Sequence, residues 1–493
     1  MVNRNTALII HEKDNVLCAL NDIKKGEAVL DFRALEDIPK GHKIALLDIE
    51  KGEEVVKYGF PIGRALKPIK RGSFVHTHNL TTNLEGVLDY TYNPVTVDED
   101  VLEYATFMGY EREDGSVGVR NEIWIINTVG CVNKTAELLA RQANERFKGK
   151  VDGVFSFCHP YGCSQLGQDA LVTQKILAGL VHHPNAAGVL VLGLGCENNN
   201  IDVFKKVLGN TNDKRVKFLE TQKVEDEIEE GLRLINVLVE YAQTFERTEC
   251  PASNLILGLK CGGSDAFSGI TANPLVGKIS DRLVAMGGTS VLTEVPEMFG
   301  AENILMDRCI NKDVFDRLVA VVNGYKEYFL KHGQVVYENP SPGNKEGGIT
   351  TLEEKSLGCV QKGGTSAVVD VLKYGDRVEK NGLNILEGPG NDMVAQTVLA
   401  ASGAQIILFT TGRGTPLGAP VPTIKISTNS ELYTRKRKWI DFNAGKLLES
   451  ESMEDMCKEL FVYILDVASG NVYTCNEKYG YREIAILKDG VTL

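Results

Sequence analysis

The sequence predicts an α/β protein in which a small N-terminal all-β domain is followed by two α/β domains with mainly parallel sheets. Three observations carry this prediction. Glycine-containing turns divide the first part of the chain into short β-like runs at intervals of about ten residues, which is typical of a small β-module. Continuous apolar runs then alternate with amphipathic helical segments, which indicates parallel sheets covered on both faces. A chain of 493 residues is also too long for one hydrophobic core.

Each domain is predicted from its own pattern. Residues 1–93 form the β-domain, with strands such as "VLCAL", "HKIALLDI" and "EVVKYG" between glycine turns. Residues 94–110 are expected to be a linker. The first α/β domain spans 111–250, where helix-like segments follow "EIWIINTVGC", "VDGVFSFCHPYGC" and "AAGVLVLGLGC". The second spans 251–493, with strands in "NLILGLKCGGSD", "GTSVLTEV" and "GAQIILFTTGRG".

Composition and charge exclude several classes of protein. The formal net charge of −12 argues against nucleic-acid binding, which needs a basic face. No run of 18 apolar residues is present to cross a membrane, and "MVNRNTALIIHEKD" has too short an apolar stretch for a signal peptide. Eleven cysteines scattered over a long chain do not resemble a disulfide framework. We therefore expect a cytoplasmic protein whose cysteines are free thiols, metal ligands or catalytic groups.

Cysteines follow several predicted strands at or just beyond their carboxyl ends. Cys131, Cys163 and Cys196 follow three successive strands, and Cys261 follows a later one. Ligands of open α/β sheets bind at these ends, and thiolates are soft ligands for iron or an iron–sulfur cluster. The alternative is that the cysteines are small residues buried in tight turns.

Histidines give a second set of candidates. His76 and His78 alternate in "RGSFVHTHNL", so both side chains would lie on one face of a strand. They are either a hydrogen-bonded pair within the β-domain or two ligands presented to a metal in a neighbouring domain. His159 in "CHPYGCSQ" is a candidate acid, base or ligand near neutral pH, or else it caps a turn.

Glycine-rich segments do not predict a nucleotide site, because "GLGCEN" and "GRGTPLG" depart from GxGxxG and no GxxxxGK[ST] is present. Arg413 in the second segment suits bidentate capture of a carboxylate, or is a surface arginine in a flexible turn. The long loop "NPSPGNKEGGITTLEEKSLGC" leads into Glu354 and Lys355. These two residues either supply acid–base chemistry or begin a solvated helix.

A third glycine-rich segment, "KCGGSDAFSGITANP", carries a high density of short polar side chains. Among them are Ser264, Asp265 and Asn273. Such a density suits a ligand with many hydroxyl groups. It equally suits a tight turn held by side-chain hydrogen bonds.

These motifs resemble the family of altronate and galactarate dehydratases. "GHKIALLDIEKGEEVVKYGFPIGRAL" with "VHTHN" is similar to the SAF-type β-domain of that family. "HPYGCSQLG", "VLGLGCENN", "CGGSDAFSGITANP", "ENPSPGNKEGGITTLEEKSLGC" and "LFTTGRGTPLG" are similar to the rest of it, in the same order over nearly the whole chain. The resemblance implies a hydro-lyase of hexuronate catabolism that converts D-altronate into 2-dehydro-3-deoxy-D-gluconate. It also implies a divalent metal, Fe²⁺ before Mn²⁺. The cysteines at the strand ends leave an iron–sulfur cluster open as an alternative.

Removal of water across C2 and C3 of a sugar acid leaves an enediolate, which a Lewis-acid metal stabilises by several kcal/mol. Two arrangements would hold that metal. In one, His76 and His78 reach it from the β-domain across a domain interface, where small-molecule sites are common. In the other, Cys131, Cys163 and Cys196 hold iron or a cluster, and the histidines are free for acid–base work.

The remaining candidates are assigned by role as hypotheses. Proton transfer is assigned to His159 and Lys355, with Glu354 as an orienting partner. Arg413 is assigned to the substrate carboxylate. The substrate hydroxyls are assigned to the polar side chains of the glycine-rich turn: Ser264, Asp265 and Asn273.

Two other functions remain open on the sequence. One is a dehydratase or lyase for another acid, such as galactarate or a sulfonated hydroxy acid, since one sequence does not reveal which hydroxyls are read. The other is a non-catalytic sugar-acid binding protein. The expected partner is a small sugar acid, with no nucleic acid and no membrane, and a closed homo-oligomer is the common assembly for such enzymes.

Overall fold

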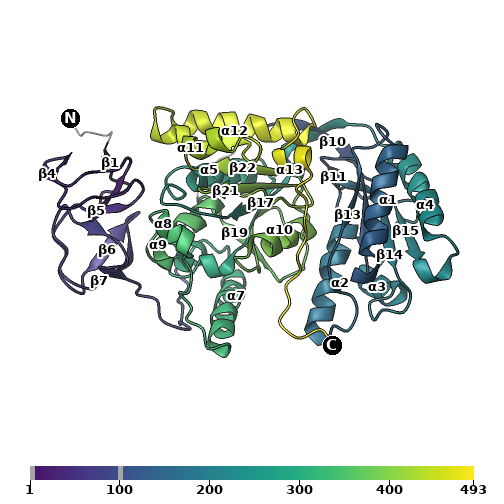
Figure 1. Ribbon diagram of the computed structural model, residues 1–493, viewed down its shortest axis with the longest axis horizontal. Helices are drawn as coiled ribbons and strands as arrows, with labels where there is room; N and C mark the ends of the chain where they lie inside the picture. The colour runs from purple at the N-terminus through teal and green to yellow at the C-terminus, as the bar shows by residue number, and fades with distance from the viewer. Residues whose placement is uncertain (1–5, 98–103) are drawn as a thin grey trace.

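The computed structural model describes residues 6–97 and 104–493. Figure 1 shows three bodies in a row, with the β-domain at one end and the 111–250 domain at the other. The domain that comes last in the sequence lies between them. The predicted fold class is confirmed, but the order of the domains in space differs from their order along the chain.

Short antiparallel strands form the β-domain, in sheets of order β1-β2-β5-β8, β3-β4 and β6-β7-β9. Its inner face joins the core of the C-terminal domain, where Ile62 and Val75 pack in one buried cluster with Phe299 and Leu352. The strands are β1 Ala7–Leu8, β2 Val16–Ala19, β3 Ala28–Val29, β4 Phe32–Arg33, β5 Lys43–Ala45, β6 Glu54–Lys57, β7 Phe60–Ala65, β8 Phe74–Val75 and β9 Leu80–Thr81.

The segment after the β-domain lies along the C-terminal domain. The Tyr92 hydroxyl donates to the Cys309 carbonyl at 2.7 Å, and the Val95 amide donates to the Asp307 carbonyl at 2.9 Å. The predicted linker 94–110 is wrong at its C-terminal end, because β10 (Thr106–Glu111) is a strand that pairs with β11 (Val117–Gly118) and β16 (Thr248–Pro251). Part of that linker, 98–103, lies outside the described residues.

The first α/β domain is a parallel sheet of order β13-β12-β14-β15. All eight residues of β14 are buried, as its continuous apolar sequence predicts. Helices α1 and α4 share a buried cluster on one face, and α2 and α3 share a cluster on the other. The elements are β12 Glu122–Asn127, η1 Gly130–Val132, α1 Asn133–Arg146, β13 Val154–Phe157, α2 Gly167–Val181, β14 Ala186–Gly193, α3 Ile201–Leu208, β15 Val216–Glu220, η2 Thr221–Lys223 and α4 Glu227–Ala242.

The second α/β domain is a parallel sheet of order β19-β20-β18-β17-β21-β22-β23. A 3₁₀ helix, η3 Ala252–Asn254, precedes the first strand. The strands are β17 Ile256–Cys261, β18 Thr289–Leu292, β19 Val368–Leu372, β20 Gly382–Leu386, β21 Ile406–Thr411, β22 Thr423–Ser427 and β23 Phe442–Asn443. Its helices are α5 Ala272–Ala285, η4 Val295–Glu297, α6 Glu302–Met306, α7 Lys312–Lys331, α8 Pro342–Glu346, α9 Leu352–Cys359, η5 Val360–Gly363, α10 Asp392–Ala401, α11 Ser430–Arg435, η6 Ala444–Leu448, α12 Met453–Ala468 and α13 Cys475–Tyr479.

The two α/β domains share a core, because α2 packs against α10. Gly179 permits this approach, since a Cβ there would lie 2.4 Å from the Ala401 carbonyl oxygen. None of the helices in the described residues is long and apolar enough to cross a membrane.

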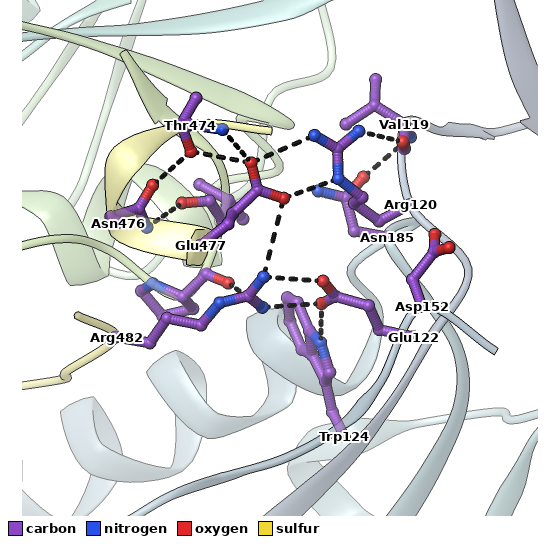
Figure 2. A network of polar contacts seen from close by, with 12 residues as sticks. Val119, Arg120, Glu122, Trp124, Asp152, Asn185, Thr474, Asn476, Glu477 and Arg482 are labelled. Carbon is purple, nitrogen blue, oxygen red and sulfur yellow. Dashed lines mark hydrogen bonds and ion pairs between the residues drawn. The ribbon is translucent and has the colours of Figure 1, made fainter. Parts of the chain in front are cut away.

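A buried ionic network also joins these domains (Figure 2). Arg120 donates to Glu477 at 2.6 Å, and Arg482 donates to Glu122 at 2.9 Å, while the Trp124 indole donates to Glu122 at 2.7 Å. Residues 474–482 therefore belong in space to both α/β domains, although they are far from 120–124 in the sequence.

Candidate active site

The site begins at the carboxyl end of β17. This strand lies between β18 and β21, so the chain leaves it to one side first and returns later on the other side. Such a switch point is where open α/β sheets bind their ligands. Cys261 ends β17, and the turn after β18 leads to Glu294 and Glu297.

Two thiols and one carboxylate meet at this point. The Cys261 and Cys359 sulfurs lie 3.4 Å apart, and they lie 3.4 and 3.3 Å from Glu297 Oε2. All three side chains are buried, and their ligand atoms lie within 4.8 Å of one another. Cys359 is the last residue of α9, so the helix after the 339–351 segment, which contains the short α8, completes the group.

Three buried ammonium groups surround these residues and face three carboxylates. Lys355 donates to Glu297 at 2.8 Å, and Lys362 donates to Glu294 at 3.1 Å. The third ammonium group forms ion pairs with two carboxylates: Lys260 with Glu294, and Lys260 with Asp392 at 2.9 Å. The charges of this cluster therefore balance.

The charge states follow from this packing. Burial alone would raise the pKa of Glu297, but Lys355, Lys260 and Lys362 lower it to about 2. Burial alone would lower the pKa of Lys355, but the charge of Glu297 outweighs burial and raises it. Lys355 is therefore an ammonium at neutral pH and is not a base there. The hydrogen bond with Cys261, followed by burial, raises the pKa of the Cys359 thiol.

Backbone strain marks the same place. Glu294 has φ +70°, in the left-handed region that non-glycine residues rarely occupy, and its side chain is buried. Strain of this kind costs of the order of 1–3 kcal/mol and concentrates at functional sites. Here it turns the chain sharply after β18, so that Glu294 and Glu297 both face the cluster.

The β-domain covers the site from the other side. Lys43 and Lys57 each donate to a different oxygen of Glu354 at 2.7 Å, and all three side chains are buried. Burial alone would raise the pKa of Glu354, but the two lysines lower it to about 2. Glu354 is thus a charged link between domains, and the contact with Lys355 that was predicted for it is taken by Glu297 instead.

A small cavity lies between the two domains. Its wall includes Tyr58 from the β-domain and Ser264, Lys355 and Cys359 from the C-terminal domain. Its volume of about 10 Å³ is room for one water molecule and not for a six-carbon acid. Ser264 Oγ is buried without a hydrogen-bond partner among the described residues, so it is free to meet a ligand.

The other predicted substrate residues lie at the same cavity or near it, but most are already engaged. Asp265 accepts from Thr428 at 2.9 Å and from other donors around it, so it holds the turn together. Asn273 donates to the Gly358 carbonyl and accepts from the Thr410 hydroxyl. Arg413 is exposed and pairs with the exposed Glu346 at 2.9 Å.

The histidine pair does not lie on a strand. β8 ends at Val75, and Asn79 closes a turn by accepting from the His76 amide at 2.9 Å. His76 reaches the C-terminal domain, with Nδ1 at 2.9 Å from Thr350 Oγ1, whereas His78 is exposed. Burial is the main cause that lowers the pKa of His76 to about 4. The expectation that both rings share one strand face is therefore wrong.

His159 and the thiols of the first α/β domain lie elsewhere. The labels of α3 and of the β-domain strands stand on opposite sides of the middle domain (Figure 1). His159 is buried in the first α/β domain. Its Nε2 donates to the Asn127 carbonyl at 2.8 Å, and its Nδ1 accepts from the Tyr161 amide at 3.2 Å. Both ring nitrogens therefore have hydrogen-bond partners, and His159 lies in a different domain from Lys355. Cys131, Cys163 and Cys196 are exposed in this distant domain and cannot share an ion with His76 or His78.

Several functional candidates were missed from the sequence. Cys359 stands in a segment that had already been singled out, and Cys261 had been placed at a strand end but not in the site. Glu297 lies two residues beyond the predicted strand segment "GTSVLTEV". The signal that identifies them is the strand-end rule, applied to β17 and β18 together. Lys43 and Lys57 carry no local signal, since their partner Glu354 is 311 and 297 residues away.

Comparisons with known proteins agree with this architecture. The family described as "D-galactarate/Altronate dehydratase, C-terminal" matches residues 252–492. The related "second domain" matches 109–243, and the "Altronate/galactarate dehydratase SAF domain" matches 5–83. The chain is 54% identical to the altronate dehydratase of Bacillus subtilis (strain 168) and 50% identical to that of Escherichia coli (strain K12), each time over 98% of this chain and 99% of the relative. It is 37% identical to the galactarate dehydratase (L-threo-forming) of Escherichia coli (strain K12), over 97% of this chain and 95% of that protein.

Proposed function

The chain belongs to the D-galactarate/altronate dehydratase family, and we propose that it is an altronate dehydratase, a hydro-lyase that converts D-altronate into 2-dehydro-3-deoxy-D-gluconate. The observation that carries this proposal is the identity of 54% and 50% to two altronate dehydratases over nearly their whole lengths. The identity to a galactarate dehydratase is 37%, so altronate is favoured over galactarate as the substrate.

The reaction removes the proton on C2 and the hydroxyl on C3 as one molecule of water. The enol that remains takes a proton on C3 and becomes the 2-keto acid. Charge builds up on the substrate carboxylate as the C2 proton leaves. The site must therefore offer positive charge or hydrogen-bond donors to that carboxylate.

Cys261, Glu297 and Cys359 fit a divalent metal, with Fe²⁺ first among the candidates. Two thiolates and a carboxylate are suitable donors for such an ion. The lysines and carboxylates around them already balance. A divalent ion that displaces the two thiol protons leaves that balance unchanged. When bound, the ion supplies Lewis-acid stabilisation of the enediolate.

This chain's own cations and hydroxyls account for the rest of the binding. The Lys355 ammonium lines the cavity and is charged at neutral pH, so it suits protonation of the departing C3 hydroxyl or stabilisation of the enediolate. The unpartnered Ser264 hydroxyl suits a substrate hydroxyl. Arg413 suits the carboxylate, because its present pair with Glu346 is exposed and such pairs contribute about 0–1 kcal/mol.

Substrate binding requires this site to open. The cavity has room for one water, and its wall is shared between the β-domain and α9. A six-carbon acid therefore fits only after these two walls move apart. Closure behind the substrate would exclude water from the enediolate, as lids and domains do in many enzymes.

We also propose that the protein is cytoplasmic. We predict that it forms a homo-oligomer. All eleven cysteines are free thiols, including the adjacent pair Cys261 and Cys359. Free thiols in this number suit a reducing compartment.

A panel of acids tests the proposal. Purified protein is loaded with ferrous iron under anaerobic conditions and given D-altronate, D-galactarate or (2R)-sulfolactate, and the 2-keto product is measured. We expect kcat/KM to be highest for D-altronate. Preference for another acid would point to a different lyase of this family, and binding without any 2-keto product would support the binding-protein alternative.

A further inference from the structure

The first α/β domain has a switch point of its own. β12 lies between β13 and β14, so the chain leaves β12 to one side and returns on the other. Three loops follow the carboxyl ends of these strands, and each carries one exposed cysteine: Cys131, Cys163 and Cys196. The altronate reaction, placed in the C-terminal domain, does not use them.

Hydrogen bonds hold the three loops against one another. The Gly130 amide donates to the Tyr161 carbonyl at 2.9 Å, and the Asn199 amide donates to the Gly162 carbonyl at 3.0 Å. Gly162 has φ +100°, and a Cβ there would lie 2.0 Å from the Thr128 carbonyl oxygen, so the first two loops are in direct contact. Each cysteine is one to three residues from one of these hydrogen bonds. The backbone therefore gathers three thiols at one edge of the sheet.

The thiols are gathered but do not form a site for a single ion. Among the described residues, the group of cysteine, histidine and acidic side chains whose ligand atoms all lie within 4.8 Å is Cys261, Glu297 and Cys359. The three exposed thiols do not all lie within this distance of one another. A group with several metal atoms spaces its thiolate ligands more widely than one ion does, and iron–sulfur clusters are held in this way.

Cys158 provides an internal contrast, because it stands in the same loop as Cys163. Its sulfur lies 3.6 Å from the Asn133 carbonyl and 3.6 Å from Glu137, and burial is the main cause that raises its pKa to about 11. Cys158 is thus a thiol with local partners. Cys163 and Cys196 have contacts of similar length, with Asn198 and the Ser164 hydroxyl for Cys163 and with the Gln222 amide for Cys196. They differ from Cys158 in being exposed.

We propose that Cys131, Cys163 and Cys196 bind an iron–sulfur cluster at the switch point of the first α/β domain. The cluster core is made of two Fe²⁺, two Fe³⁺ and four S²⁻, so its assembly needs no further oxidant. Binding replaces the three thiol protons with iron and releases those protons to solvent. Three thiolates leave one iron of a four-iron cluster open to a ligand from outside the protein. This centre lies in a different domain from Cys261 and Cys359, so it goes beyond the proposed reaction and does not depend on it.

Reconstitution tests the proposal. The full chain is first reduced with a thiol and desalted. It is then incubated anaerobically with equal amounts of ferrous and ferric iron and with sulfide, desalted again, and assayed for iron and acid-labile sulfide. Visible absorption and the electron paramagnetic resonance of the dithionite-reduced protein are recorded on the same samples. We expect about four iron and four sulfide atoms per chain in the cluster, with broad absorption near 400 nm that dithionite bleaches.

Matched variants separate this centre from the other thiols. We expect C131S, C163S and C196S each to lose most of the labile sulfide, while C158S in the same loop retains it. C261S should retain the sulfide and lose only the iron assigned to the C-terminal site, so the two proposals fail independently. Circular dichroism checks that every variant is folded. The proposal is overturned if the folded wild type takes up iron without sulfide, or if C158S loses the cluster as completely as C163S.

Discussion

The link between Glu354 and its two lysines gives a prediction that can be worked out in detail. Replacing the carboxylate by an amide of the same shape, E354Q, leaves Lys43 and Lys57 buried without a counter-ion. Lys43 retains the Gly348 carbonyl and the Thr350 hydroxyl as acceptors. Lys57 retains a contact of 4.9 Å with the Tyr58 ring. Breaking a buried pair in this way costs about 3–5 kcal/mol.

Thermal unfolding followed by circular dichroism measures this cost. For cooperative unfolding of a chain of 493 residues, a loss of 3–5 kcal/mol lowers Tm by about 3–5 °C. D48N is the control, because it breaks the exposed 2.9 Å pair with Lys70 in the same domain and should cost less than about 1 kcal/mol. Replacing Lys43, Lys57 and Glu354 together by methionine should recover most of the loss, since no charge is then left buried.

The result that would refute this reasoning is specific. If E354Q keeps the wild-type Tm and the iron content but loses turnover, Glu354 acts on the reaction through Lys355, as the sequence had indicated. A Tm loss no larger than that of D48N would show that the two lysines do not depend on the carboxylate.

Three further predictions follow from the site and its surroundings. K355M should lower kcat by about 10²–10⁴-fold while the bound iron is unchanged. Steady-state kinetics and metal analysis on one preparation would check this. Loss of iron in step with activity would contradict the role assigned to Lys355. R413K should raise KM for D-altronate about tenfold with little change in kcat, because a point charge replaces a planar fork, and an unchanged KM would remove Arg413 from the carboxylate site. Burial lowers the pKa of His183 to about 3, so the unfolded chain binds a proton between pH 6.5 and 3 that the folded chain does not. Stability should therefore fall by up to about 5 kcal/mol as the pH drops through that range, and H183Q, compared by Tm at pH 7.5 and 4.5, should show a weaker dependence on pH.

The parts of the fold that depend on residues close together in the sequence could be predicted from the sequence. β14 is buried over its whole length, as its apolar run indicates, and the glycine turns of the β-domain fall between short strands. The turn at His76 could not be predicted from the alternation of the two histidines. The Asn79 side chain accepts a hydrogen bond from the backbone amide of His76, and the strand ends there. The position of the last domain between the other two depends on surfaces that no periodicity reveals.

The candidate site could also be predicted only in part. Lys355, Ser264 and Arg413 stand in unusual segments and could be identified as candidates, but their protonation states and partners depend on residues far away. Lys355 is held as an ammonium by Glu297, 58 residues earlier in the chain. Asp265 and Asn273 line the cavity, yet their hydrogen bonds are used by the fold itself.

The most direct test compares the rate of 2-keto acid formation from D-altronate by iron-loaded C359S with the rate of wild type and of C158S. Iron per chain is measured in the same samples. We expect C359S to lose both the C-terminal iron and turnover, while C158S turns over D-altronate at the wild-type rate. Undiminished turnover by a C359S protein that has lost its iron would contradict a metal-assisted elimination at the carboxyl end of β17.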